Sequence, residues 1–237
     1  GIEAFNCESL QEIFVINEMA HIHGVKANVS VRINPDIDAH THKYVTTGLY
    51  ENKFGISQHE FDKLIEILHK SEHINFIGLH FHVGSRITRV EEVFGLECRR
   101  VNEIVRYFEG KGLKVNNINL GGGLGVDYDD PDGSAIADFG TWFSTIAANI
   151  ERRPDQAVHV EPGRSLVAQC ATLISRVVFV KSGETKNFLI MDAGMNDLIR
   201  PALYGAYHKI ENLSASQRQF FPTFQAYDIV GPVCESS

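Results

Sequence analysis

The sequence predicts an α/β fold in which a parallel sheet is covered by helices, followed by a smaller antiparallel β element. Two observations predict this fold. Up to about residue 170, short apolar runs alternate with longer segments of helical spacing, and after residue 170 this alternation stops. Repeated strand and helix units of this length are typical of an open doubly wound sheet or of a closed (β/α) barrel.

Five short runs rich in β-branched and other apolar residues are expected to form the parallel strands. They are IEAFN at 2–6, VSVRI at 29–33, INFIGLHFH at 74–82, VNNINL at 115–120 and AVHVE at 157–161. Between these runs, apolar residues recur three and four positions apart, which predicts helices. These residues are Leu10, Ile13, Phe14, Ile16 and Met19, then Phe61, Leu64, Ile65 and Leu68, then Val90, Val93, Phe94, Val101, Ile104, Val105 and Phe108.

The ends of these helices carry capping signals. A hydroxyl followed three residues later by a glutamate is the capping-box pattern, and it occurs at Ser9–Glu12, Ser57–Glu60 and Thr88–Glu91. Glycines stand where helices would end, at Gly24 and at Gly110 or Gly112.

The second part of the chain is expected to be a β domain. TLISRVVFV at 172–180 and FLIMDAG at 188–194 predict a hairpin, and AYDIVGPV at 226–233 predicts a further strand. The predicted domains are therefore 1–170, a partial barrel that binds a cofactor, and 171–237, the start of a C-terminal β domain. A complete eight-unit barrel takes about 250 residues, so we expect the chain to be truncated at both ends.

Composition narrows the class of protein. The chain of 237 residues carries 22 Lys and Arg against 30 Asp and Glu, scattered rather than clustered, which argues against nucleic-acid binding. The four cysteines are far apart and show no C-x-x-C spacing, so neither a zinc site nor a disulfide framework is indicated. There is no apolar run of eighteen residues. We expect a cytoplasmic protein that does not bind a membrane.

Polar residues follow the predicted strands at their carboxyl ends, where ligands bind in parallel α/β folds. His80 and His82 stand two apart on one strand face, a run of glycines follows residue 120, and Glu161 and Arg164 follow the fifth strand. The glycines predict either a phosphate-binding loop or a tight turn that packs helix to strand. The two histidines are either ligand or core residues, or metal ligands together with His40 and His42. Glu161 and Arg164 also fit a buried ion pair.

Six motifs, in order, resemble those of the diaminopimelate decarboxylases, the fold-type III pyridoxal-phosphate-dependent decarboxylase family. They cover essentially the whole chain: RINPDIDAHTHKYVTTGLYENKFGIS (32–57), GLHFHVGS (78–85), LGGGLGVDY (120–128), EPGRSLVA (161–168), DAGMNDLIRPALYGAYH (192–208) and GPVCESS (231–237). The resemblance implies a TIM-type (β/α) barrel, here incomplete at its N-terminal side, followed by part of an antiparallel β domain.

The resemblance also implies roles for individual residues around pyridoxal 5'-phosphate. His82 would stack on the pyridine ring and Ser85 would lie near the phosphate. Gly121, Gly122, Gly123, Gly163 and Arg164 would hold the phosphate. Glu161 would bind the protonated pyridine nitrogen, so that the ring can act as an electron sink.

On the substrate side, the resemblance places Arg164, Arg200 and Tyr204 near the distal amino-acid centre of diaminopimelate. An arginine fork suits a carboxylate there. Cys234 resembles the family's proton donor and Glu235 its acceptor for the distal ammonium. Because the family brings these last two residues from a neighbouring subunit, a homodimer is implied.

The function implied is decarboxylation of meso-diaminopimelate to L-lysine, the last step of lysine biosynthesis. The lysine that anchors the cofactor as a Schiff base is expected to lie outside these 237 residues, because Lys26, in VKANVSV, falls in the wrong strand unit. Three alternatives stay open: a fragment that binds phosphate or pyridoxal phosphate without catalysis, a related decarboxylase of another basic amino acid, and a metal-dependent barrel hydrolase using His80 and His82.

Overall fold

The computed structural model describes residues 2–37, 53–133, 137–214 and 225–234. The chain divides into two compact units. The first comprises Gly1–Val126 and Ile136–Ala168, and the second comprises Asp127–Ala135 and Gln169–Ser237. Each unit is described by itself.

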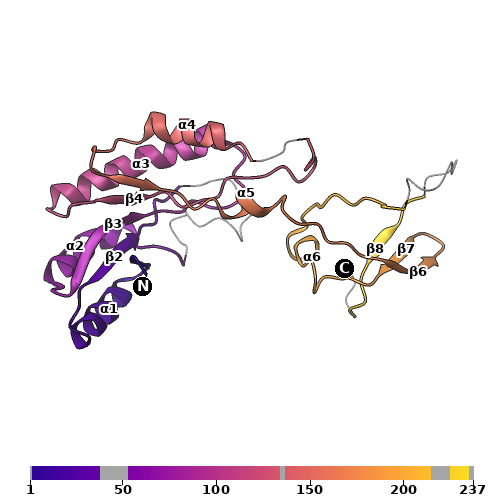
Figure 1. The fold of residues 1–237 in the computed structure, drawn as a ribbon, viewed down its shortest axis with the longest axis horizontal. Coiled ribbons are helices and arrows are strands. Elements are labelled where there is room, and N and C mark those ends of the chain that lie inside the picture. The colour runs from indigo at the N-terminus through magenta and orange to yellow at the C-terminus, as the bar shows by residue number, and fades with distance from the viewer. Residues whose placement is uncertain (1, 38–52, 134–136, 215–224, 235–237) are drawn as a thin grey trace. The chain divides into compact units, whose positions relative to one another are not determined.

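The first unit is a parallel sheet with helices between its strands (Figure 1). The strands are β1 (Phe5–Cys7), β2 (Ala27–Arg32), β3 (Ile74–His80), β4 (Asn117–Asn119) and β5 (Ala157–His159), paired in that order. The helices are α1 (Leu10–Ile22), the 3-10 turn η1 (Gln58–Glu60), α2 (Phe61–Lys70), α3 (Val90–Gly110), α4 (Phe139–Asn149) and α5 (Gly163–Val167). All four strand pairs are parallel, which confirms the predicted α/β class.

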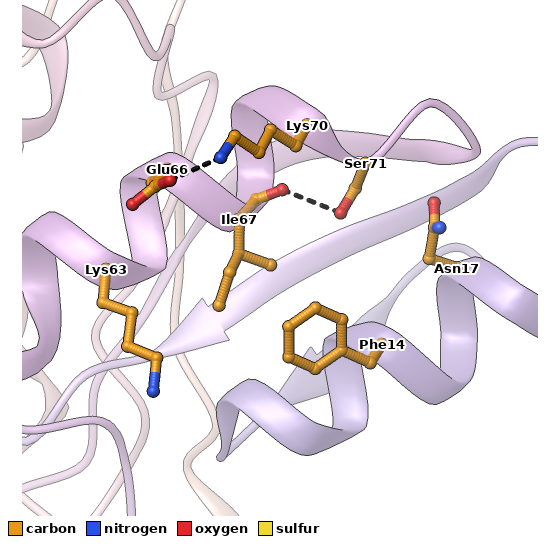
Figure 2. A pocket seen from close by; sticks show the side chains of 7 residues that line it. All are labelled: Phe14, Asn17, Lys63, Glu66, Ile67, Lys70 and Ser71. Carbon is orange, nitrogen blue, oxygen red and sulfur yellow. Dashed lines mark hydrogen bonds and ion pairs between the residues drawn. The ribbon is translucent and has the colours of Figure 1, made fainter.

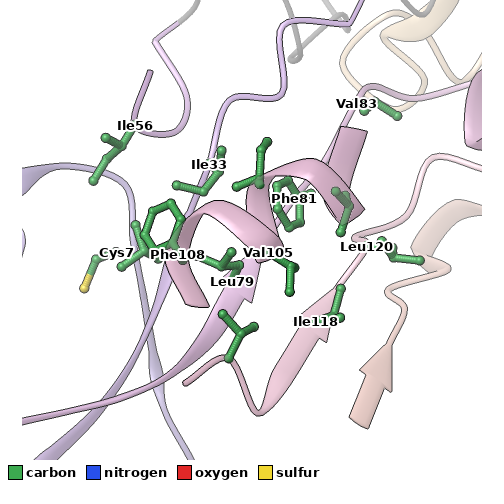
Figure 3. Close-up of a cluster of buried hydrophobic side chains, with 14 of the residues drawn as sticks. Cys7, Ile33, Ile56, Leu79, Phe81, Val83, Val105, Phe108, Ile118 and Leu120 are labelled. Carbon is green, nitrogen blue, oxygen red and sulfur yellow. The ribbon is translucent and has the colours of Figure 1, made fainter. Parts of the chain in front are cut away.

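The two faces of this sheet differ in polarity because side chains alternate along each strand. One face is apolar and buried, with side chains such as Val31, Leu79 and Ile118 fully buried. Phe81 and Leu120 continue this face just beyond their strands, and Phe108 of α3 lies in the same buried cluster (Figure 3). The intervening positions are polar.

The polar face carries amide and imidazole groups that bond across strands. Asn75 of β3 donates to Asn28 of β2 at 2.7 Å, and Asn117 of β4 lies 3.4 Å from a ring nitrogen of His159 of β5. A parallel sheet covered on both faces would be apolar on both. A polar face on a parallel sheet therefore points to a functional surface.

Helix α4 was not predicted from the sequence. It buries Trp142, Thr145 and Ile146, and Asp138 caps it by accepting a hydrogen bond from the Thr141 amide at 2.9 Å. The ring centroid of Trp142 lies 5.4 Å from that of Phe94 of α3. Among the described residues, no helix is long and apolar enough to cross a membrane.

The capping boxes differ from the prediction at two of the three helices. The Ser9–Glu12 box is confirmed, since the Ser9 hydroxyl accepts from the Glu12 amide at 3.3 Å and the Glu12 carboxylate accepts from the Ser9 amide at 3.0 Å. The box at Ser57 is wrong, because that side chain makes no capping bond to η1. The box at Thr88 is also wrong, because α3 begins at Val90 and its cap position is Arg89.

Substituting Ser9→Ala is expected to lower the free energy of unfolding by about 1 kcal/mol, since an amide of α1 then loses its acceptor. Ser57→Ala is the matched control and is expected to change little, because Ser57 caps nothing. Urea unfolding of both variants measures the difference. An equal effect of the two substitutions would contradict the assigned cap.

Glu97 is a buried carboxyl of α3. The residue is 0% exposed, and within the part of the chain that the structure describes neither carboxyl oxygen has a hydrogen-bond partner. Burial raises the pKa of Glu97 well above its ordinary value of 4.5. Above pH 4.5, the Glu97 carboxyl of the folded protein therefore keeps a proton that the same group in the unfolded chain releases.

The stability of the protein is expected to fall as pH rises above about 4.5, because the folded state binds more protons than the unfolded state between the ordinary and the raised pKa. Glu97→Gln should remove this dependence, and Glu97→Met should raise the free energy of unfolding by about 1–3 kcal/mol at pH 8. Denaturation of each variant between pH 5 and pH 8 is the measurement. Glu91→Gln, on the exposed side of the same helix, is the control. If the free energy of unfolding of Glu97→Gln changed with pH as that of the wild type does, the interpretation would be wrong.

The second unit is built on a three-stranded sheet (Figure 1). β6 (Val177–Ser182) and β7 (Asn187–Met191) pair antiparallel, which confirms the predicted hairpin. β8 (Asp228–Val230) pairs with β7 in the parallel direction, so the sheet is mixed and the expectation of an antiparallel element is corrected. Parallel pairing requires a crossover connection, and the chain from 192 to 227 supplies it, carrying α6 (Arg200–Tyr204).

Candidate functional site

Three of the sequence motifs meet at the carboxyl ends of the strands in the first unit. Their contact is visible at the glycine loop after β4, where an added Cβ would collide with backbone atoms of the neighbouring strand ends. At Gly121 it would lie 2.3 Å from the carbonyl oxygen of Phe81, and at Gly122 it would lie 1.9 Å from that of Glu161. At Gly123 the obstacle is the carbonyl oxygen of Gly84, at 2.2 Å. The loop thus fits between β3 and β5 only as glycine.

The backbone amides of this loop are partly used within the protein. Gly121 donates to the Asn119 side chain at 2.8 Å, and Gly122 donates to His82 Nδ1 at 3.1 Å. The amide of Gly123 donates to no group among the described residues. Both interpretations of the glycine run therefore receive support: all three glycines make tight packing contacts, and the Gly123 amide stays available to an anion.

His82 is held in a defined orientation and is neutral at pH 7. Because Nδ1 accepts the Gly122 amide, the ring proton belongs on Nε2. Burial lowers the pKa of His82 to about 4, with smaller contributions from Arg32 and His80. A neutral ring oriented by this hydrogen bond is suited to stacking on a flat aromatic ligand.

Glu161 follows β5 and lies beside two polar groups of the same sheet face. Its Oε1 accepts from Asn119 Nδ2 at 2.9 Å, and its Oε2 lies 3.4 Å from His80 Nε2. The second contact is not a hydrogen bond, because neither ring nitrogen of His80 has a hydrogen-bond partner among the described residues. Burial lowers the pKa of His80, which favours its neutral form. The Glu161 side chain is 50% exposed, so the carboxylate keeps an open side toward a ligand.

Arg164 lies on α5, three residues after Glu161. Its Nη1 is buried and has no hydrogen-bond partner among the described residues, so this donor can still bind an anion. No ion pair joins Arg164 to Glu161 among the described residues, contrary to the alternative of a buried pair. Gly163 has open space around its Cβ position, and Ser85 is half-buried in the loop after β3.

Arg32 and Glu8 complete this edge of the sheet and were missed as site residues. Arg32 is the last residue of β2 and Glu8 directly follows β1, and Arg32 Nη1 lies 2.5 Å from Glu8 Oε1. The Arg32 guanidinium contributes to the lowered pKa of both His80 and His82. The available signal was position, since each residue stands at the carboxyl end of a predicted strand.

The second unit contains the other predicted site residues. Arg200 and Tyr204 lie four apart on α6 and so share one side of that helix. The Arg200 guanidinium stacks 4.7 Å above the ring of Tyr128, a residue that sequence reasoning gave no role.

The last motif of the chain contacts the segment that leads to α6. A Cβ on Gly231 would lie 2.2 Å from the Cα of Gly194, which brings GPVC and DAGMND together. Cys234 is exposed at the end of this segment, and Glu235 lies outside the described residues.

Two other features lie away from the strand ends. Lys26 stands at the amino end of β2, the opposite edge from Arg32. A surface pocket between α1 and α2 belongs to the helix layer, where Lys70 and Glu66 form an ion pair and Ser71 bonds to the Ile67 carbonyl (Figure 2). The described residues contain no group of three or more His, Cys, Asp or Glu that could hold a metal ion, and His40 and His42 lie outside them.

Together, the groups at the strand ends fit pyridoxal phosphate. Glu161 offers a half-exposed carboxylate and His82 a neutral ring, and Arg164 Nη1 and the Gly123 amide are donors without a partner among the described residues. The fold and these residues define a cofactor-binding α/β domain. Residues 1–168 match the family described as pyridoxal-dependent decarboxylase, pyridoxal binding domain. The chain belongs to this family.

Similar proteins come from several bacteria. The chain is 50% identical over 237 residues to a diaminopimelate decarboxylase of Bacteroides thetaiotaomicron, covering 100% of this chain and 60% of that protein. A diaminopimelate decarboxylase of Haemophilus influenzae is 37% identical over 236 residues, which are 100% of this chain and 55% of that protein. The chain thus spans somewhat over half the length of these relatives.

Solved structures agree with the fold. The crystal structure of diaminopimelate decarboxylase from Helicobacter pylori complexed with L-lysine is 36% identical and superposes with a TM-score of 0.86, covering 99% of this chain and 56% of that one. Lysine decarboxylase from Selenomonas ruminantium, at 21% identity and a TM-score of 0.75 over 98% of this chain and 56% of that one, shares the fold. These neighbours support the assignment of the five parallel strands to a (β/α) barrel fold.

Proposed function

We propose that this chain forms part of a pyridoxal-phosphate-dependent enzyme that decarboxylates meso-diaminopimelate to L-lysine. The observation that carries the proposal is the meeting of three motifs at the strand ends, where the glycine loop, His82 and Glu161 contact one another. The similarity to diaminopimelate decarboxylases over the whole chain supports the substrate.

Bound pyridoxal phosphate supplies an electron sink for the bond that loses carbon dioxide. Glu161 would hold a proton on the pyridine nitrogen, and Asn119 keeps this carboxylate in place through its 2.9 Å hydrogen bond. His82 would support the ring from one side, with its orientation set by Gly122. Arg164, with its unpartnered Nη1, would bind phosphate together with Gly163 and the Gly121–Gly123 loop, and Ser85 would lie beside them.

The substrate-side roles rest on the second unit. Arg200 would grip the distal carboxylate of diaminopimelate, with the ring of Tyr128 beneath it limiting the directions its fork can take. Tyr204, on the same side of α6, would add a hydroxyl to this grip, and Arg164 would serve the same centre. Cys234 would hand a proton to the α-carbon after carbon dioxide leaves, and Glu235 would accept the distal ammonium.

The substrate is tested with protein expressed from its complete coding sequence. Supplied with pyridoxal phosphate, it is expected to release carbon dioxide from meso-diaminopimelate much faster than from ornithine or arginine. Only diaminopimelate has a second, distal carboxylate that Arg200 can bind. Preference for ornithine would point to a related decarboxylase of another basic amino acid. Cofactor binding without release from any of the three would point to a binding protein.

We also propose that the enzyme is a cytoplasmic homodimer whose active site is shared between subunits. The resemblance of Cys234 and Glu235 to residues that reach a neighbouring active site supports this. Light scattering gives the mass in solution. Mixing an inactive Cys234→Ala protein with an inactive Glu161→Gln protein should restore part of the activity if the site is shared, and an unrestored mixture counts against it.

A further inference from the structure

Two histidines that are distant in sequence meet on the helix layer of the first unit. His21 lies in the last turn of α1, and His73 lies in the turn between α2 and β3. His21 Nδ1 is 2.9 Å from His73 Nε2, and the ring centroids are 4.7 Å apart at an interplanar angle of 57°. His21 is exposed and His73 is half-buried, so solvent reaches the pair.

The backbone around His73 holds its ring in this position. The His73 amide donates to Asn17 Oδ1 at 3.0 Å, and its carbonyl accepts from the Ala27 amide at 2.9 Å. Asn17 lies one turn before His21 on α1, so one helix face carries both the anchor and the partner imidazole. The two nitrogens therefore face each other because the fold places them, not because of local sequence.

The contact between the two rings is a hydrogen bond in which one neutral ring donates its N–H to the nitrogen of the other, and without that proton the two lone pairs would repel. A transition-metal ion between the two nitrogens removes this repulsion as well. Nitrogen ligands lie about 2.0–2.1 Å from such an ion, and two of them at a right angle to each other are then about 2.8–3.0 Å apart. The 2.9 Å separation of His21 and His73 fits this geometry.

We propose that His21 and His73 form a two-histidine site for a divalent metal ion that takes ligands at right angles, Ni²⁺ or Cu²⁺, which imidazole suits. Water would fill the other coordination positions, because the described residues offer no group of three or more metal-binding side chains. The site lies at the amino ends of β2 and β3, the opposite edge from Glu161 and His82. It would join α1 to the turn before β3.

Calorimetric titration of tag-free protein with Ni²⁺ tests this site. His21→Gln and His73→Gln are each expected to weaken Ni²⁺ binding by about tenfold or more, since loss of even an outer-shell partner costs about 10–100-fold at metal sites. His23→Gln is the matched control, because it removes an exposed imidazole at the same helix end and leaves the pair intact. It should bind as the wild type does.

Two further readouts separate metal binding from a folding defect. Ni²⁺ should raise the melting temperature of the wild type and of His23→Gln but not of the two pair variants, because a ligand of the folded state stabilises it. Electron paramagnetic resonance of the Cu²⁺-loaded wild type should show two imidazole nitrogens. Equal Ni²⁺ affinity in all four proteins, or an equal loss in His23→Gln, would overturn the proposal and leave the pair as a proton-sharing contact only.

Discussion

Gly122→Ala is expected to destabilise the first unit by about 1–3 kcal/mol or more and to weaken pyridoxal-phosphate binding by at least about tenfold. The new Cβ would lie 1.9 Å from the Glu161 carbonyl oxygen, and backbone atoms of a strand end yield little. Either the glycine loop or Glu161 has to move. A shifted loop also stretches the hydrogen bond that orients His82. Chemical unfolding and a fluorescence titration with the cofactor measure the two effects.

Gly163→Ala is the matched control for this experiment. Gly163 belongs to the same proposed phosphate site, yet a Cβ there meets no atom within 4 Å. We therefore expect the unfolding free energy of Gly163→Ala to stay within about 0.5 kcal/mol of wild type. If the two alanine variants behaved alike, close packing would not be the reason for glycine at position 122.

Glu161→Gln is expected to lower kcat for diaminopimelate decarboxylation by about 10²-fold or more while leaving KM nearly unchanged. The amide oxygen can still accept the Asn119 hydrogen bond, so the side chain keeps its place but loses the charge that, in the proposed function, holds a proton on the cofactor nitrogen. The variant should fold and bind cofactor as the wild type does. Stopped-flow and steady-state assays on protein from the complete coding sequence give both constants.

Glu161→Asp separates charge from shape. It keeps a carboxylate on a shorter side chain, and we expect it to recover part of the activity that Glu161→Gln loses. A Glu161→Gln enzyme with wild-type kcat would show that this carboxylate does not support the electron sink.

The parallel strands could be predicted because alternation and helical spacing are local properties of the chain. The parallel pairing of β8 with β7 could not, because it depends on a contact made across the crossover segment 192–227. Helix α4 was missed although Asp138 offered a capping signal. The failed box at Thr88 shows that a hydroxyl and a glutamate at the right spacing do not fix where a helix begins.

The candidate site shows the same division. His82, Glu161 and the glycine loop could be found because each follows a strand, and strand ends share one edge of a parallel sheet. The hydrogen-bond partners of the glycine amides could not be predicted, because Gly122 donates to His82, forty residues earlier in the chain. The pair of Arg32 with Glu8 joins two strands in the same way. Single residues were predictable, whereas their partners required the fold.

The parallel addition of β8 has a consequence for the order of folding. A hairpin such as β6–β7 closes a short loop, whereas β8 pairs only after the segment 192–227 has crossed over. Closing the longer loop costs more chain entropy and proceeds more slowly. We therefore expect the segment that carries Cys234 to be among the last parts of the second unit to become ordered, so that a nascent chain positions this proposed proton donor after the rest of the unit.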